Sequence, residues 1–526
     1  MKKVEKAARL EAETVRGSPG PAKRLFFWLG LVLFCAFLLL PAPSGMEPAA
    51  KRLLGVAALM SCWWLGEVVH LAAVALIPLV LFPLLDVLGM EETAASYADQ
   101  TIFLFLGGLF IAAASQRWGL HRRMALNVLC VLGARPRGLV LGFMAATAVV
   151  SMWVSNTATA VMMFPIGLSV LLCVIGKRPE ELRQARGEER NFSVALMLGI
   201  AYGASIGGMA TLVGSPPNLV LAGQLRKLFP DAPEIGFARW MSIGLPLSLL
   251  FLAAAWVCLC WILFPVRRLG TERGRDLLRK EREQLGPMSR GEAWTLAAFL
   301  VAVLLWLTRE PLPLGGLRFP GWVGLLPWAS SVRDSTVAMA VSLALFWVPV
   351  DRSRGVYVLN WEWASKIPWD VLLLFGGGFA LAGAFRATGL SGWFAARLEG
   401  LEGLPPVTMV LAVCLLMTLL TELTSNTATT AVMLPVLAAT AAKMHVNPLL
   451  LMVPATFSAS CAFMLPVATP PNAVVFASGC LDVATMARAG LLLNLVGLVL
   501  IPFVLFAAGF DLLQVSTTTM PGWAAP

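Results

Sequence analysis

"SMWVSNTATAVMMFP" occupies residues 151–165, and "TELTSNTATTAVMLP" occupies residues 421–435, which lie 270 positions later. Seven of the fifteen aligned positions are identical. At the same offset, the pair Gly107-Gly108 aligns with Gly377-Gly378, and Gly119-Leu120 aligns with Gly389-Leu390. Self-similarity at a fixed offset indicates an internal duplication. The duplicated segments therefore predict that the chain folds as two related halves.

A second pair of motifs follows the first. "GSPPN" (214–218) aligns with "ATPPN" (468–472) at an offset of 254, and the difference from 270 matches an extra hydrophilic stretch at 176–190 in the first half. Each pair of prolines lies within an apolar run. Because proline lacks an amide donor and clashes with the preceding turn, each pair is predicted to break its helix.

The composition places the chain in a membrane. Hydrophobic residues make up 58% of the 526 residues, charged residues only 13%, and the mean hydropathy is +0.78. These values are typical of a polytopic helical membrane protein. About eleven apolar stretches are long enough to span. They are 25–41, 51–66, 70–88, 101–117, 193–222, 240–264, 293–307, 335–350, 368–387, 449–478 and 487–512.

Two further apolar segments, around 138–175 and 405–442, carry polar residues at their centres. The span count requires each of them to enter and leave on the same side, which predicts two re-entrant hairpins. The predicted fold class is thus an all-α polytopic membrane protein with about eleven transmembrane helices and two hairpins in an inverted repeat.

Basic residues predict the orientation. The tail 1–24 carries seven Lys/Arg against three Glu, and the segment 265–292 carries eight against five acids, so both are placed in the cytoplasm. They flank a first half at 25–264, and a second, inverted half follows at 293–526. An odd number of spans then places the C-terminus outside. Because the net charge of +10 lies in short loops, a nucleic-acid partner is not expected.

Inverted repeats with interrupted helices at matching positions are typical of secondary transporters. A membrane enzyme would need a nucleophile–base pair or a metal cluster at membrane depth, and the sequence offers neither. A channel would show oligomeric pore symmetry instead of an inverted internal repeat. We therefore expect a carrier, without catalytic residues.

The motif chemistry suits a cation and an anion together. Hydroxyl, amide and freed carbonyl oxygens form a neutral, hard-oxygen cage of the kind that suits Na⁺. Helix N-termini at the breaks favour an anion, and Asn and Thr donors can bind its oxygens. Neither motif contains Lys or Arg. The clearest carboxylates at membrane depth are Glu67 and Glu422, and for Glu422 both a bracing role and substrate contact remain open.

At these residues the chain resembles the divalent anion/sodium symporter (DASS) family of dicarboxylate, tricarboxylate and sulfate carriers. The features that carry the resemblance are the two "SNT" motifs, "GSPPN" and "ATPPN", the segment 101–123, and Trp63, Trp64 and Glu67. The resemblance implies a homodimer with an elevator-type motion, in a bacterial-type inner (plasma) membrane. Two departures are Gly66–His70 and Ser215, which stands where many relatives have Thr.

The resemblance also implies the ligands. The first Na⁺ site would use Ser151, Ser155, Asn156 and Gly214, and the second would use Thr421, Thr424, Asn426 and Ala468, partly through backbone carbonyls. The substrate would meet Asn156, Thr157, Ser215 and Pro216 from one half and Asn426, Thr427, Thr469 and Pro470 from the other.

The leading hypothesis is Na⁺-coupled symport of C4-dicarboxylates such as succinate, fumarate and malate, with Na⁺ as a co-transported ion. The alternatives are a Na⁺-independent dicarboxylate exchanger and a Na⁺-coupled sulfate or citrate transporter.

Overall fold

The computed structural model is mostly helical in its described part, which covers residues 21–132, 135–177, 182, 186–266, 272–314, 317–319, 321–326, 331–390, 393 and 405–524. Most of the predicted N-terminal tail and residues 267–271 of the predicted 265–292 linker lie outside the described residues. Within the described residues, eight helices are long and apolar enough to cross a membrane, and four shorter apolar helices accompany them. The chain is therefore a helical membrane protein, and the count of about eleven spans stays a prediction.

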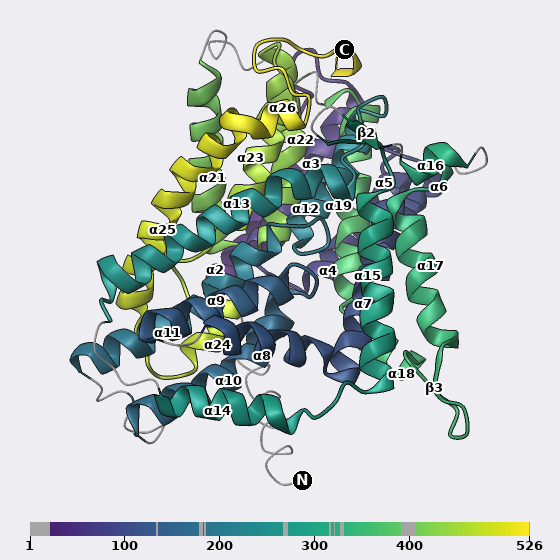
Figure 1. The fold of residues 1–526 in the computed structure, drawn as a ribbon. Coiled ribbons are helices and arrows are strands. Elements are labelled where there is room, and N and C mark those ends of the chain that lie inside the picture. The colour runs from purple at the N-terminus through teal and green to yellow at the C-terminus, as the bar shows by residue number, and fades with distance from the viewer. Residues whose placement is uncertain are drawn as a thin grey trace.

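Figure 1 shows the elements in their order along the chain. In the first half they are α2 (Pro21–Leu39), α3 (Pro48–Leu65), α4 (Leu71–Ala75), α5 (Ile77–Leu84), α6 (Met90–Ala95), η1 (Ser96–Ala98), α7 (Gln100–Trp118), α8 (Leu120–Leu132), α9 (Pro136–Ser151), α10 (Asn156–Ile175), α11 (Gly187–Gly208), α12 (Pro216–Leu228), α13 (Phe237–Val257) and the π-helical η3 (Cys258–Leu263).

In the remainder they are α14 (Glu272–Gln284), α15 (Arg290–Leu307), β1 (Leu312–Leu314), β2 (Leu317–Phe319), α16 (Trp322–Leu325), α17 (Asp334–Trp347), β3 (Pro349–Asp351), β4 (Val356–Tyr357), α18 (Trp361–Ala364), α19 (Trp369–Ala387), α21 (Pro406–Leu423), α22 (Asn426–Lys443), α23 (Leu449–Ala459), α24 (Pro470–Phe476), α25 (Val483–Val504), the π-helical η5 (Leu505–Gly509), α26 (Phe510–Leu512) and η6 (Gly522–Ala524).

Two short antiparallel hairpins correct the expectation of an all-α fold. β1 pairs with β2, and β3 pairs with β4 with one register shift. Both lie in connections between helices of the second half, and β3 overlaps the last two residues of the predicted span 335–350. Strands of two or three residues leave no hydrophobic periodicity to detect.

The proline pairs break their helices as predicted. α11 ends at Gly208 and α12 begins at Pro216, while α23 ends at Ala459 and α24 begins at Pro470. Proline is favoured in the first turn of a helix because the amide it lacks has no partner there. The predicted spans 193–222 and 449–478 are thus each interrupted. We call residues 209–215 the first break and residues 460–469 the second break.

The polar-centred segments are likewise interrupted. α9 and α10 are separated by residues 152–155, and α21 and α22 by residues 424–425. We call residues 151–157 the first tip and residues 421–427 the second tip. The order from α9 to η3 recurs from α21 to η5, including the π-helical turn at the end of the last long helix. This recurrence extends the duplication beyond the quoted motifs.

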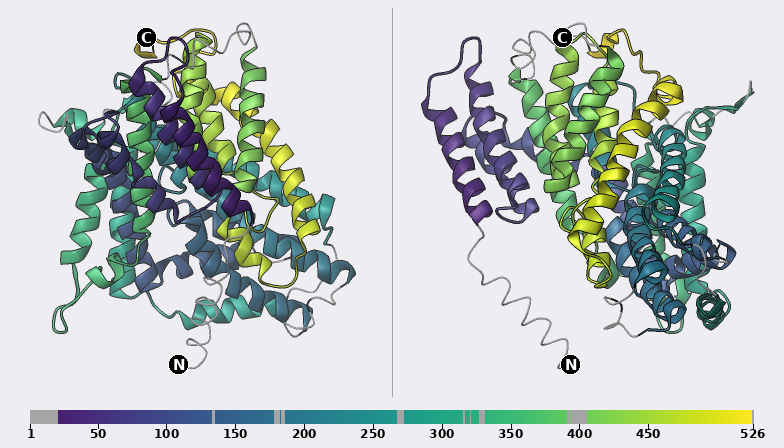
Figure 2. Two further views of the ribbon diagram at one scale, coloured as in Figure 1. Left: turned by 180° about the vertical axis from the view of Figure 1, so that it is seen from behind. Right: turned by 90° about the vertical axis from the view of Figure 1, so that its left-hand side faces the viewer.

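The helices pack in two groups. One group contains both tips and both breaks and consists of α9–α13 with α21–α25; we call it the site-bearing unit. The other group contains α2–α7 and α15–α19, in which α7 packs against α15 and α17, and α19 against α4; we call it the frame. α2 and α3 form a pair at one edge of the frame (Figure 2). α12 and α22 supply much of the contact between the unit and α19.

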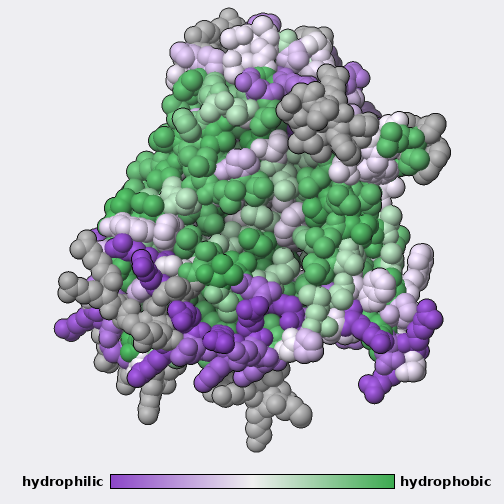
Figure 3. All heavy atoms as spheres, viewed as in Figure 1, coloured by the Kyte–Doolittle hydropathy of each residue, from purple (hydrophilic) through white to green (hydrophobic). Residues whose placement is uncertain are grey.

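Hydrophobic side chains cover a broad band of the surface, and hydrophilic side chains gather at the end where α14 lies (Figure 3). This distribution fits a bilayer around the band. Inside the site-bearing unit the halves pack crosswise, since α10 contacts α24 and α22 contacts α12. Each tip helix therefore lies against the broken helix of the other half.

Candidate functional site

The first tip brings three oxygen atoms together. Ser151 Oγ lies 2.7 Å from Asn156 Oδ1 and 2.8 Å from the carbonyl oxygen of Ala204 in α11. A hydroxyl carries one proton, so it can donate fully to only one of the two oxygens. The first tip therefore holds more acceptor oxygens than protons, and a cation would satisfy the excess.

The first break lies directly against this tip. A Cβ placed on Gly208 would stand 2.6 Å from Asn156 Oδ1, and one on Gly214 would stand 2.7 Å from the Gly208 carbonyl oxygen and 3.0 Å from that of Met152. Such close approach requires glycine, because contacts this short leave no room for a Cβ. The structure thus brings Ser151, Asn156 and Gly214 together, as the resemblance implied for the first Na⁺ site.

The other predicted residues of the first half have different surroundings. The hydroxyl of Ser155 accepts the amide hydrogen of Ala158 and so caps α10. Thr157 is exposed in the first turn of α10. Ser215 is buried at the N-cap of α12 but makes no capping hydrogen bond with its side chain, and Pro216 beside it is half-buried. The hydroxyl of Ser215 is thereby left available to a ligand.

The second tip repeats the geometry of the first. Thr421 Oγ1 lies 2.5 Å from Asn426 Oδ1 and 2.7 Å from the carbonyl oxygen of Ala459, which ends α23. One hydroxyl proton again faces two acceptor oxygens. Thr424, in contrast, donates to the carbonyl of Leu420 and contacts the hydroxyl of Thr429. The Thr424 hydroxyl is therefore engaged with the adjoining helices.

Three further predicted residues lie in or beside the second break. Thr469 is buried and accepts the amide hydrogen of Asn472 with its side chain, so it caps α24. Ala468 is buried beside it, and Pro470 is exposed. Thr427, at the start of α22, is also buried. Thr469 thus differs from its counterpart Ser215 in having its hydroxyl committed to a helix cap.

The last residue of each proline motif has a role that sequence reasoning missed. Asn218 Nδ2 donates to the carbonyls of Gly208 and Thr211, at 3.0 and 2.8 Å. Asn472 Nδ2 donates to the carbonyls of Ala462 and Leu465, both at 3.0 Å. Each side-chain amide thus donates to backbone carbonyls that lose their helical partners at the break. The Oδ1 atom of each asparagine is buried and has no hydrogen-bond partner. The signal was the repetition of Asn in "PPN".

Glu422 holds the backbone of the second break through hydrogen bonds. Its carboxylate accepts backbone amide hydrogens from Phe463, Met464 and Leu465, at 2.8–3.2 Å, and a side-chain hydrogen of Asn494 at 2.7 Å. No Lys, Arg or His pairs with it among the described residues. Backbone and amide donors thus hold a buried negative charge beside the second break.

Glu67, the other carboxylate at membrane depth in the sequence, lies elsewhere. It is exposed in the turn between α3 and α4 and has a positive φ of 43°. Its neighbour His70 caps α4 and lies 3.6 Å from Asp370 of the frame. Glu67 is therefore separate from the tips and breaks.

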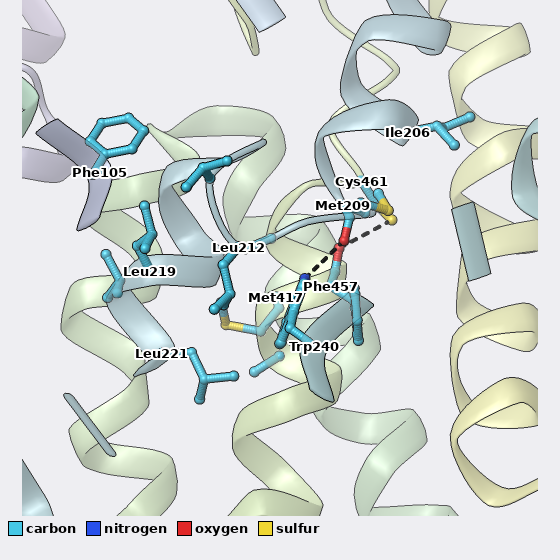
Figure 4. Packing of buried hydrophobic residues seen from close by; sticks show 14 of the residues in the cluster. Phe105, Ile206, Met209, Leu212, Leu219, Leu221, Trp240, Met417, Phe457 and Cys461 are labelled. Carbon is cyan, nitrogen blue, oxygen red and sulfur yellow. Dashed lines mark hydrogen bonds between the residues drawn. The ribbon is translucent and has the colours of Figure 1, made fainter. Parts of the chain in front are cut away.

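Aromatic side chains join the two breaks. Tyr202 of α11 donates to the carbonyl of Phe463 in the second break, and Trp240 of α13 donates to the carbonyl of Met209 in the first break. Trp240 also stacks on Phe457 of α23, with ring centroids 4.6 Å apart. Figure 4 shows Met209, Trp240 and Phe457 packed against one another. The two halves therefore share one rigid centre.

The electrostatics of the site come from the backbone and from neutral side chains. α10, α22 and α12 all begin at the tips or breaks, so the positive ends of their dipoles lie there. Among the described residues, no group of three or more His, Cys, Asp or Glu could hold a metal ion. The donor set consists of hydroxyl, amide and carbonyl oxygens, which suits Na⁺.

Known proteins match the chain over nearly its whole length. Residues 23–511 match the family model described as the sodium:sulfate symporter transmembrane region. The chain is 40% identical over 482 residues to the sodium-dependent dicarboxylate transporter SdcS of Staphylococcus saprophyticus, covering 91% of this chain and 90% of that protein. It is 38% identical over 484 residues to SdcS of Staphylococcus aureus strain NCTC 8325, covering 91% and 89%.

Two solved structures share the fold. MtrF of Neisseria gonorrhoeae superimposes with a TM-score of 0.58 at 14% identity and covers 96% of this chain and 97% of its own. The YdaH transporter of Alcanivorax borkumensis superimposes with a TM-score of 0.56 at 16% identity and covers 93% and 99%. The curated relatives are transporters, in line with the expectation of a carrier. The resemblance seen in the sequence is confirmed: the chain belongs to the divalent anion/sodium symporter family.

Proposed function

We propose that this protein is a secondary active transporter that carries C4-dicarboxylates such as succinate, fumarate and malate together with Na⁺. The observation that carries the proposal is the pair of matching contacts, Ser151 with Asn156 and Thr421 with Asn426, in which one hydroxyl proton faces two acceptor oxygens. The names of the relatives, sodium-dependent dicarboxylate transporters, support the same cation and substrate class.

Each half would supply one Na⁺ site. The first would use Ser151, Ser155, Asn156 and Gly214, and the second Thr421, Thr424, Asn426 and Ala468. The proximity of Ser151, Asn156 and Gly214 supports the first set directly. Ser155 accepts the amide hydrogen of Ala158, and Thr424 donates its proton to the carbonyl of Leu420. Each hydroxyl oxygen would therefore coordinate Na⁺ through a remaining lone pair.

The dicarboxylate would lie between the two tips. One carboxylate would meet Asn156, Thr157 and the Ser215–Pro216 turn, and the other would meet Asn426, Thr427 and the Thr469–Pro470 turn. Neither tip contains Lys or Arg, so bound Na⁺ and helix dipoles would offset the charge of the anion. This dependence on Na⁺ couples the two substrates, since the anion binds well only after the cations.

Transport would follow from movement of the site-bearing unit against the frame, in an elevator-type mechanism. The tips would act as re-entrant hairpins from opposite sides of an inverted repeat, in a homodimer. The N-terminus would lie in the cytoplasm and the C-terminus outside. The separate packing of the two helix groups supports this division of labour.

The test is succinate uptake into proteoliposomes with and without an inward Na⁺ gradient. We expect concentrative uptake that requires Na⁺ and is inhibited by fumarate and malate. Uptake that ignores Na⁺ but needs internal dicarboxylate would instead establish an exchanger. Na⁺-dependent uptake of sulfate or citrate, with no uptake of succinate, would establish the corresponding Na⁺-coupled carrier.

A further inference from the structure

A cluster of five charged side chains lies where the frame meets the connection between α12 and α13. Arg309 is at its centre with only 4% of its side chain exposed, and its guanidinium lies 2.7 Å from both Asp334 and Glu310. Glu234 joins the cluster at 3.5 Å from Arg309 and 3.2 Å from Arg333. A guanidinium this deeply buried needs carboxylate partners to offset its desolvation.

The cluster crosses from one helix group to the other. Arg309, Glu310, Arg333 and Asp334 belong to the frame, because they directly follow α15 or lie at the start of α17. Glu234 belongs to the site-bearing unit, because it lies between α12 and α13. The contacts of Glu234 with the two arginines are therefore contacts between the unit and the frame.

A helix-capping hydrogen bond also joins the frame to the site-bearing unit. Asp334 Oδ2 accepts the amide hydrogen of Phe237, the first residue of α13, at 2.7 Å. A carboxylate at a helix N-terminus is favoured by the helix dipole and by the free amide groups there. The residue before it is Gly236, and a Cβ on Gly236 would stand 3.3 Å from Arg309 and 3.4 Å from Asp334. Glycine therefore lets the connection lie directly on the cluster.

The buried arginine of the cluster keeps its partners within the frame when the unit moves away. Arg309 would retain Asp334 and Glu310, so its buried charge would stay compensated. Arg333 and Glu234 have side chains that are 48% and 32% exposed, so water can solvate both after separation. Exposed ion pairs of this kind are weak enough to open and close reversibly.

Space for such movement lies beside the cluster. A cavity of about 350 Å³ is lined by the first turn of α7, by Leu212 of the first break, by Arg226 of α12, and by Glu234, Arg333 and Asp334. The cavity thus lies between the first break and the frame, next to the charged contacts that join the unit to the frame. Closing or widening this cavity is the displacement that movement of the unit would produce.

We infer that Glu234, Arg333 and the Asp334 cap on α13 form a state-dependent latch that holds the site-bearing unit against the frame at one end of its travel. The inference rests on the proposed function, since it assumes that the unit moves. Salt bridges that form in one state and break in another are a common way of biasing such transitions. The latch would set the population of the conformation described here and leave the ligand sites intact.

Hydrogen exchange of the purified full-length protein, read by mass spectrometry over residues 231–240, tests the latch. We expect Glu234→Gln and Arg333→Gln each to speed exchange there by about two- to five-fold, the range of an exposed ion pair. The exchange rate of the double variant should be close to that of either single variant, because both changes remove the same contact. Glu310→Gln is the matched control, since it removes an Arg309 partner within the frame and should leave the rate unchanged.

The same measurement on the wild-type protein, with Na⁺ and succinate or with choline alone, tests the dependence on state. We expect the exchange rate at 231–240 and at the first tip to change together when the ligands are added. A response at the tip without one at 231–240, or Glu234 and Arg333 variants that match Glu310→Gln, would overturn the latch. No response at either segment would instead overturn the proposed function on which it rests.

Discussion

At the scale of single residues, the two tip asparagines carry the strongest claim to binding. Asn156 and Asn426 each place Oδ1 against a hydroxyl that has a competing carbonyl acceptor. Among the hydrogen bonds between side chains of the two motifs, this contact is the one that repeats at the offset of 270. A role in helix capping alone would not need the surplus of acceptors.

The first prediction follows from these contacts. Asn156→Ala and Asn426→Ala should each raise the Na⁺ concentration for half-maximal uptake at least about ten-fold, because each change removes one oxygen of a cation cage. Proteoliposome uptake across a Na⁺ series measures it. Asn360→Ala is the control: Asn360 caps α18 in the frame, so its loss should cost about 1 kcal/mol of stability and leave the Na⁺ dependence unchanged. A normal Na⁺ dependence in both tip variants would assign the asparagines a structural role only.

Glu422 leads to a second prediction at this scale. Glu422→Gln replaces one acceptor oxygen by an NH₂ group that faces the amide hydrogens of Met464 and Leu465. Lost charge-assisted hydrogen bonds to a buried group cost about 1.5–3 kcal/mol each, so the variant should be markedly less stable. Size-exclusion chromatography after graded heating measures the loss. Glu67→Gln, at an exposed carboxylate, should melt like the wild type. Equal stability of Glu422→Gln and the wild type would contradict the bracing role.

At the scale of elements, the sequence predicted where helices stop better than what fills the gaps. The proline pairs located both breaks, and the polar triplets located both tips, because these are local signals. The structural roles of Asn218, Asn472 and Glu422 could not be predicted from the sequence in this way. Their partners are backbone groups that become available only when a break has formed, and the bond of Glu422 to Phe463 spans 41 residues. Contacts across the latch span up to 99 residues and have no local signature.

The end of α11 provides the third prediction. Gly208→Ala should abolish Na⁺-dependent uptake, because its Cβ would stand 2.6 Å from Asn156 Oδ1 and would displace the tip. Gly383→Ala within α19 is the matched control, since a Cβ there meets nothing within 4 Å. In a helix interior, alanine should stabilise that variant by about 0.5–1 kcal/mol relative to glycine. Uptake and heat stability, measured in parallel, separate the two effects. Similar behaviour of the two variants would show that the close approach at Gly208 is dispensable.

At the scale of the whole molecule, the crosswise packing makes each half contribute to the position of the other half's tip. α10 rests on α24 and α22 on α12, so each tip is positioned by the broken helix of the other half. The Tyr202 and Trp240 hydrogen bonds fix the two breaks to one centre. In the proposed elevator-type mechanism, movement of one tip would therefore be transmitted to the other, and the site-bearing unit would move as a single body past the frame. The latch at Glu234 acts on that body from outside the binding site.

The last prediction concerns the orientation of the whole molecule in the membrane. α14 lies at one end of the molecule and carries Arg273, Arg275, Arg279, Lys280 and Arg282, whereas α26 and the C-terminus lie at the opposite end (Figure 1). Basic segments are retained in the cytoplasm, so α14 should lie inside and the C-terminus outside. Alkaline phosphatase fused after Pro526 should be active and green fluorescent protein dark there. The same reporters inserted after Gln284 should give the reverse pattern, which serves as the internal control. Active phosphatase at Gln284 together with a fluorescent C-terminus would show that the orientation is the reverse of the predicted one. The latch would then hold the unit against the frame on the cytoplasmic side.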